Sequence, residues 1–144
     1  TRSKFWVSEA PSKVLFFSWR LLLDRLPSFE QLHKRHIHIQ NLEVSYYFCN
    51  SRKETTQHLF LMCSKSIRFG MGFLGVDIEL LLEINRLYDQ FGLLICGRKG
   101  RRWKHLIWHG TWWCIWKLRN AIAFMETLFN GAKLLEDIKI TSWQ

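Results

Sequence analysis

The chain has 144 residues, enough for one domain with a substantial core, and 48% of them are hydrophobic, with eight Trp and eleven Phe. This content excludes a chain that is disordered by composition. The formal net charge of +9 favours a polyanionic partner, nucleic acid above all, although a merely solvated basic surface is the alternative.

The chain is not expected to cross a membrane or to be exported. Its longest apolar stretch, 106–118, is short and interrupted by polar residues. The sequence starts at Thr1 without an apolar signal core, and it stops at Gln144 within a helical pattern. We therefore expect both ends to continue in a longer polypeptide.

The first predicted elements are two helices. Proline is tolerated in the first turn of a helix, and the residue before a proline avoids helical geometry, so the first helix is expected between Pro11 and Pro27. Ser28, with Gln31 three residues later, predicts a capping box for a second helix from 29 to about 36. Helices joined this closely predict an αα-hairpin.

The next segment is less regular. Alternating residues at 37–40 and aromatic residues at 46–48 indicate a short extended piece. Thr55 or Thr56 can cap a helix that carries His58 and Cys63, because a hydroxyl accepts from the first unpaired N–H groups of a helix.

The second half of the chain predicts three further helices. After a glycine-containing segment at 70–75, an amphipathic helix is expected at 77–88. A long helix from about 100 to 125 carries five Trp and is apolar around most of its circumference, so it should be buried or paired. Gly131 is expected to separate it from a last helix that runs from 132 to the end. The predicted fold is mostly α, in a single domain.

Three residues form a candidate metal site: Cys49, His58 and Cys63. In a reducing compartment, Cys and His at such spacing indicate metal binding more than a disulfide. A closed structural zinc site takes four ligands, and this window supplies three of the usual kinds. Alternatively, both Cys are small buried apolar residues and His58 is a polar residue at a helix N-terminus.

Three stretches together resemble the zinc-binding region of plant reverse transcriptase-like proteins, which follows the polymerase in non-LTR retrotransposons. The stretches are Pro11-Ser-Lys-Val-Leu-Phe-Phe-Ser-Trp-Arg-Leu-Leu-Leu-Asp-Arg-Leu-Pro27, then Cys49 with Glu54-Thr-Thr-Gln-His-Leu-Phe-Leu-Met-Cys63, and Trp108-His-Gly-Thr-Trp-Trp-Cys-Ile-Trp-Lys-Leu-Arg-Asn120. The resemblance implies a helical hairpin, a small zinc-knuckle-like segment, a long Trp-rich helix and a terminal helix. It also implies two parts: a zinc-binding-like domain at 1–95, with its core motif at 11–70, and a Trp-rich extension at 96–144 packed on it.

The family motif has a Cys-x-x-Cys pair followed by His and Cys. Carried over to this chain, the second Cys is Cys49, the His is His58 and the last Cys is Cys63, whereas the first Cys falls on Tyr46. A neutral phenol is a poor substitute for a thiolate, so we expect a degenerate site that binds Zn weakly or not at all. His36 or His38 is the alternative fourth ligand.

The densest positive run is a candidate nucleic-acid contact. It lies at the start of the long helix and comprises Arg98, Lys99, Arg101, Arg102 and Lys104. Lys and Arg neutralise phosphates and release counterions. The alternative is a solvated helix N-terminus, although positive charge there opposes the helix dipole.

Nothing in the sequence predicts catalysis. Cys96 and Cys114 lie in apolar runs and are expected to be core thiols, and a packing role is favoured for His105 and His109. The resemblance implies a non-catalytic accessory module that binds zinc, contacts RNA or DNA and works beside the reverse transcriptase domain of a parent polyprotein, with no small-molecule substrate. The alternative is a protein–protein docking or structural module with no metal or nucleic-acid role.

Overall fold

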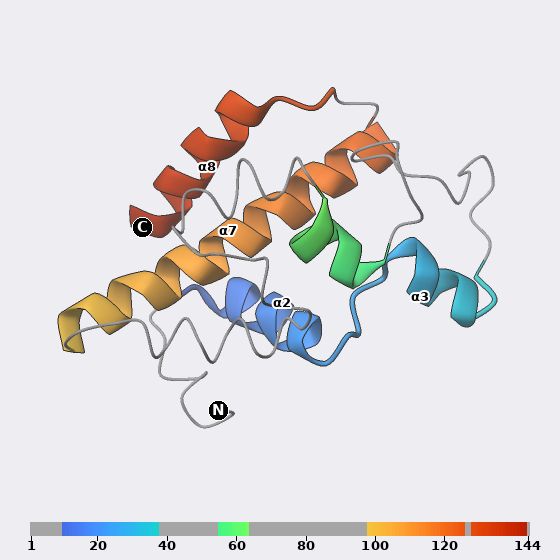
Figure 1. Cartoon of the computed structure of the whole chain (residues 1–144), viewed down its shortest axis with the longest axis horizontal. Helices are drawn as coiled ribbons and strands as arrows, with labels where there is room; N and C mark the ends of the chain where they lie inside the picture. Colours follow the sequence, from blue (N-terminus) through green and yellow to red (C-terminus); the bar gives the residue numbers. More distant parts are fainter. Residues whose placement is uncertain (1–9, 38–54, 64–97, 126–127, 144) are drawn as a thin grey trace.

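The computed structural model describes residues 10–37, 55–63, 98–125 and 128–143. In the long helix at 98–125, the side chains are described from residue 106 onward. The elements are α2 (Ser12–Leu22), α3 (Phe29–Lys34), the π-helical turn η1 (His58–Met62), α7 (Arg98–Met125) and α8 (Gly131–Trp143) (Figure 1). No strand occurs in these segments, which confirms the mostly helical fold.

The long helix α7 is the centre of the fold. It crosses the whole molecule, with α8 along one side and α2 along the other, and η1 lies near its middle (Figure 1). The middle of α7 is buried almost all round, including Trp108, Trp112 and Ile115 at 0% exposure. The prediction that this helix is buried is therefore confirmed for its middle, whereas Phe124 and Met125 at its end are exposed.

Aromatic rings from three elements meet in the core. The Phe17 ring of α2 lies 5.3 Å from the Trp113 ring and 6.5 Å from the Phe60 ring, measured between centroids. The Phe60 ring of η1 lies 5.0 Å from the Trp112 ring at an interplanar angle of 76°. Edge-to-face pairs of this kind contribute about 0.5–1.5 kcal/mol each beyond their buried area, so they hold α2, η1 and α7 in one core.

The helix α2 ends earlier than Pro27 predicted. Asp24 has a φ of 51°, and the Arg25 and Asp24 N–H groups donate to the Arg20 and Leu21 carbonyls at 2.8 and 3.0 Å. This pattern is a Schellman motif, which closes a helix with one left-handed residue. The expectation that Pro27 ends the helix was therefore wrong, because the left-handed turn at Asp24 ends it three residues earlier.

The helix α3 has the predicted cap but only half of the capping box. The Ser28 hydroxyl accepts from the Gln31 N–H at 3.4 Å, whereas the Gln31 side chain donates to the Asp24 carboxylate at 3.1 Å. At the other end, His36 has a φ of 56° and the Ile37 N–H donates to the Leu32 carbonyl at 3.0 Å. A second Schellman motif thus ends α3, at Lys34 rather than near 36.

The boundaries of the last two helices are close to those predicted. The structure begins α7 at Arg98 and ends it at Met125. In α8, Gly131 is the first helical residue and not the separator, since the Asn130 side chain accepts from the Lys133 N–H at 3.1 Å and caps the helix.

Three predicted features lie outside the described residues: the extended piece beyond Ile37, the glycine-containing segment at 70–75 and the helix at 77–88. Within the segments that the structure describes, no helix combines the length and the apolar character needed to span a bilayer.

Candidate functional site

Two of the predicted metal ligands lie at the two ends of a π-helical turn. The Cys63 N–H donates to the His58 carbonyl at 2.7 Å, which is an i→i+5 bond. In a regular α-helix, residues five apart differ by about 140° around the axis. In the π turn, a backbone hydrogen bond joins the two residues directly. Their five-residue spacing, which would place them on different faces of a regular α-helix, therefore corresponds to one turn here.

One side-chain hydrogen bond and two buried side chains hold the turn in place. The Thr55 hydroxyl accepts from the His58 N–H at 3.0 Å, which confirms the predicted cap. Within η1, Leu59 and Phe60 have 0% exposure. Packing of these two side chains against the core therefore positions His58 and Cys63, and sequence reasoning had not assigned Phe60 this role.

The donors at the turn suit zinc. His58 and Cys63 are buried, at 7% and 1% exposure, and Cys63 is a thiol. Imidazole nitrogen and thiolate sulfur are the usual ligands of structural zinc, so both residues carry donor atoms of the kinds that such a site uses. Cys49 and Tyr46 lie outside the described residues, and among those described no three His, Cys, Asp or Glu side chains are grouped for a metal ion.

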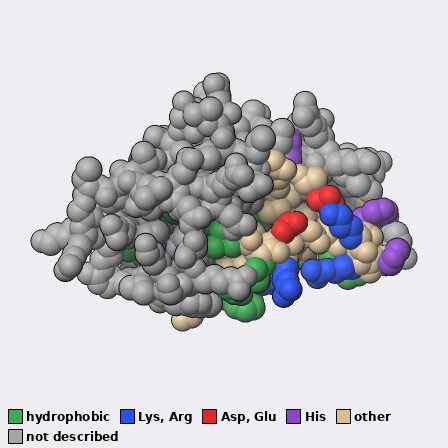
Figure 2. Space-filling model, turned by 60° about the horizontal axis from the view of Figure 1, so that its bottom comes forward, with side chains coloured by type: hydrophobic (Ala, Val, Ile, Leu, Met, Phe, Trp, Pro, Cys, Tyr) green, Lys and Arg blue, Asp and Glu red, His purple; other side chains and the backbone are tan. Residues whose placement is uncertain are grey.

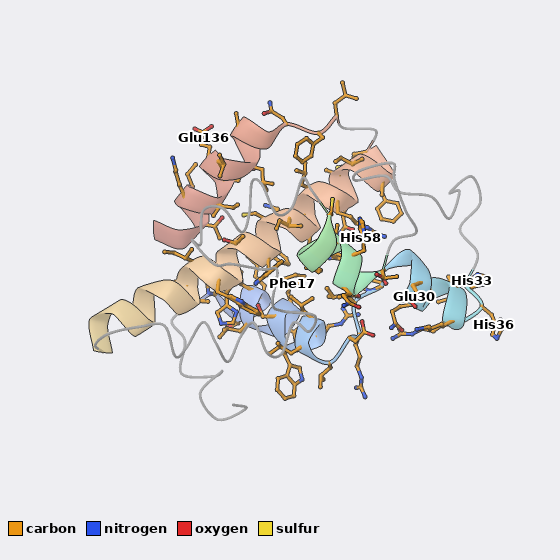
Figure 3. All side chains as sticks on the ribbon, viewed as in Figure 1. Phe17, Glu30, His33, His36, His58 and Glu136 are labelled. Atoms are coloured by element: carbon orange, nitrogen blue, oxygen red, sulfur yellow. The ribbon has the colours of Figure 1, made fainter. Side chains whose placement is uncertain are left out.

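The alternative fourth ligand His36 is not near this turn. His36 is exposed at the far end of α3, well separated from the buried His58 (Figure 3). The left-handed turn that ends α3 fixes the His36 backbone there. His36 is therefore not a ligand in this structure, and His38 lies outside the described residues.

Residues 1–69 match the family described as zinc-binding in reverse transcriptase (zf-RVT). The match covers just under half of the chain, and over these residues the chain is similar to that family. The match covers α2, α3 and η1, including the buried His58–Cys63 turn. The family is a zinc-binding accessory domain and not a polymerase domain. No curated protein and no solved structure matches the chain.

The predicted nucleic-acid residues lie in the first two turns of α7. Positions 98, 101 and 102 follow the i, i+3, i+4 spacing of one helix face, and the first turn has no acidic residue. The free N–H groups of a helix N-terminus add to the attraction for a phosphate. The backbone arrangement therefore places this basic run where an anion is favoured.

A buried polar pair joins α2 to α7. The Ser18 hydroxyl lies 2.7 Å from His109 Nδ1, and both residues have 0% exposure. His109 therefore makes a buried contact that holds α2 against α7. The interior also encloses the Arg119 guanidinium, 4.8 Å from the Trp116 ring centroid and bonded to Asn120 Oδ1 at 2.8 Å. The sequence predicted neither contact, because each depends on which face of α7 is covered.

The Cys114 thiol is a core thiol, as predicted. It lies 3.4 Å from the Thr141 hydroxyl of α8. Burial raises the pKa of Cys114 above its ordinary value of 9.0, and the Thr141 hydrogen bond acts in the opposite direction. A thiol held neutral in this way is not a nucleophile.

Proposed function

We propose that this chain is a non-catalytic, zinc-binding-type accessory module of a retrotransposon reverse transcriptase-like protein, with a degenerate metal site. The observation that carries the proposal is the π turn that joins His58 and Cys63 inside a region of the zinc-binding family. Tyr46 stands where the family's first Cys is expected, so Cys49, His58 and Cys63 remain as the ligand set.

Zinc, where it binds, would serve as a structural crosslink between the segment around Cys49 and η1. Structural zinc contributes to folding because its ligands must be brought together. In this chain Leu59 and Phe60 already anchor η1 in the core, so the fold around the site does not depend on the metal. We therefore infer weak zinc binding without loss of the helical fold.

Metal analysis of the purified chain tests this proposal. The wild-type protein is expected to retain less than one zinc per chain after dialysis, and Tyr46→Cys is expected to restore stoichiometric zinc by completing the four-ligand set. Cys49→Ser in the Tyr46→Cys background should lose the metal again. Stoichiometric zinc in the wild type that Cys49→Ser removes would contradict the degenerate site.

We further propose that the module contacts nucleic acid through Arg98, Lys99, Arg101, Arg102 and Lys104. The net charge of +9 and the position of this run at the N-terminus of α7 support the contact. Arg101→Glu with Arg102→Glu is expected to abolish salt-dependent binding of single-stranded RNA. Wild-type protein that fails to bind RNA at low salt would refute this part of the proposal.

One observation favours the second candidate, a docking module. Three large apolar side chains are exposed where α7 ends and the chain turns toward α8: Phe124, Met125 and Leu128. An exposed apolar group of this kind is typical of a protein contact surface. The test measures binding of a neighbouring reverse transcriptase domain to the wild-type chain and to the double variant Met125→Asp with Leu128→Asp. Binding of the wild type alone would support docking, whether or not the chain also binds RNA.

A further inference from the structure

The segment that carries α2 and α3 (residues 10–37) was predicted as a helical hairpin, and the name hairpin is kept for it although its two helices have little contact with each other. Its outward surface has a feature that the core does not require. Phe16 is 59% exposed, although α2 buries its other phenylalanine, Phe17, at 4% exposure. Lys13 and Arg20 stand one turn before and one turn after Phe16, and Arg20 Cζ lies 6.0 Å from the Phe16 ring centroid. An exposed aromatic ring is thus flanked by two cations on one helix face.

The same hairpin carries an excess of positive charge. Residues 10–37 contain five Lys and Arg against two acidic residues, Asp24 and Glu30. Both acids are engaged within the hairpin, since Glu30 pairs with Lys34 at 3.1 Å and Asp24 accepts from the Gln31 side chain. The positive charge of the hairpin is therefore only partly balanced by its own carboxylates.

The remaining cations are available to a ligand. Lys13, Arg25 and Arg35 are exposed, and none has a carboxylate partner among the described residues. The Arg20 guanidinium donates to the Arg25 carbonyl at 3.1 Å, which holds its side chain along the end of α2. Figure 2 shows hydrophobic side chains, then Lys and Arg with acidic side chains beside them, then His side chains across this face.

We propose that this surface binds single-stranded nucleic acid, with an unpaired base stacked on Phe16 and the cations on the phosphates. The hairpin surface is defined by Lys13, Phe16, Arg20, Arg25, Lys34 and Arg35. Stacking on an exposed aromatic ring beside a positively charged track is the usual chemistry of single-strand binding, and only an unpaired base offers its face to the ring. The inference rests on the proposed nucleic-acid partner but places a contact on a different surface from Arg98–Lys104.

The test uses the full chain and a fluorescent single-stranded oligouridylate of roughly 15 nucleotides, a length that spans one binding module. Phe16→Ala is expected to weaken binding by about tenfold or more through loss of a stacked base. Arg25→Glu with Arg35→Glu is expected to weaken it further and to lower the slope of log K against log salt by roughly 0.7 for each lost phosphate contact. A duplex of the same length should bind less tightly, and Phe16→Ala should not change its affinity.

Each variant has a matched control on another element. Phe124 is 55% exposed on α7 and also lies near an arginine, so Phe124→Ala controls for loss of an exposed ring. Lys133→Glu with Lys139→Glu, on exposed positions of α8, makes the same change of net charge as the hairpin reversal. Both controls are expected to bind nearly as wild type, and circular dichroism should show unchanged helix content in all variants.

Four results would overturn the proposal. One is equal weakening by the hairpin and α8 charge reversals, which would show that net charge alone sets affinity. Another is wild-type affinity for the Phe16→Ala variant, and a third is equally tight binding of a polyglutamate peptide. Loss of binding in Arg101→Glu with Arg102→Glu, but not in the hairpin variants, would leave the proposed function standing and remove this inference.

Discussion

At the scale of single residues, two left-handed positions decide where α2 and α3 end. Asp24 and His36 both have positive φ and both close a Schellman motif. Glycine is the usual residue at such a position because a Cβ atom is crowded there, although Asp and His tolerate it better than most residues. The chain thus ends both helices without glycine.

We predict that Asp24→Ala is less stable than Asp24→Gly by about 1 kcal/mol, because both lose the carboxylate and only Ala keeps a Cβ in the left-handed region. Urea unfolding of the two variants measures the difference. The same two substitutions at Asp137, which is exposed within α8, should show the opposite order. There the Gly variant should be less stable than the Ala variant by about 1 kcal/mol, because glycine is disfavoured inside a helix. The same order at both sites would contradict the assigned turn.

The raised pKa of Cys114 gives a pH prediction. Burial keeps the folded thiol protonated above the ordinary value of 9.0, whereas the unfolded thiol ionises there. The stabilisation is therefore full below about pH 9 and falls as the pH rises further, because the unfolded state then binds fewer protons. Thermal unfolding of wild type and Cys114→Ala should show a steeper alkaline loss of stability in the wild type; parallel curves would refute the assignment.

At the scale of elements, η1 depends on the hydrophobic side chains between its two predicted ligands. Phe60 touches the rings of Phe17 and Trp112, while His58 and Cys63 stand at the ends of the turn. In this chain Phe60 follows His58 by two positions, so the residue that anchors the turn lies between the two predicted ligands. Packing and ligand geometry are therefore coupled in one turn.

We predict that Phe60→Ala destabilises the fold by about 3–5 kcal/mol, the usual cost of removing a fully buried phenylalanine. Phe16→Ala, at an exposed position, should change stability by no more than about 0.5 kcal/mol. Chemical denaturation of the two variants gives the comparison. A small effect of Phe60→Ala would mean that η1 is held by something other than the aromatic core.

At the scale of the whole molecule, α7 joins the family region to the rest of the chain. Residues 1–69 supply α2 and η1, and both pack on α7, which lies beyond the matched residues. The Ser18–His109 pair crosses the same boundary. We therefore expect the family region to need α7 for a complete core.

This arrangement predicts how the protein responds to a chelator. With EDTA, the wild type is expected to keep its helical circular dichroism and to change its melting temperature little, because the aromatic core holds η1 in place. The Tyr46→Cys variant loaded with zinc should melt at a higher temperature, and EDTA should reverse that gain. Unfolding of the wild type by EDTA would show that zinc is required for the fold.

Much of this architecture could be predicted from local sequence signals. The Ser28 and Thr55 caps and the length of α7 follow from hydroxyl positions and from apolar periodicity, which act over a few residues. The family was also predicted from the resemblance of three sequence stretches, and the match to residues 1–69 confirms it. The nucleic-acid residues and the division at residue 95 stay predictions.

The sequence by itself determined most of the described helices, the family resemblance and the residues that could bind zinc, because helices depend on near neighbours and the resemblance is carried by short runs of residues. Only the tertiary structure decided that His58 and Cys63 are joined by a π turn, that Phe60 anchors this turn on Trp112, and that Phe16 is exposed while Phe17 is buried. These features depend on which helix faces meet, and that choice is made by packing of segments far apart in the chain.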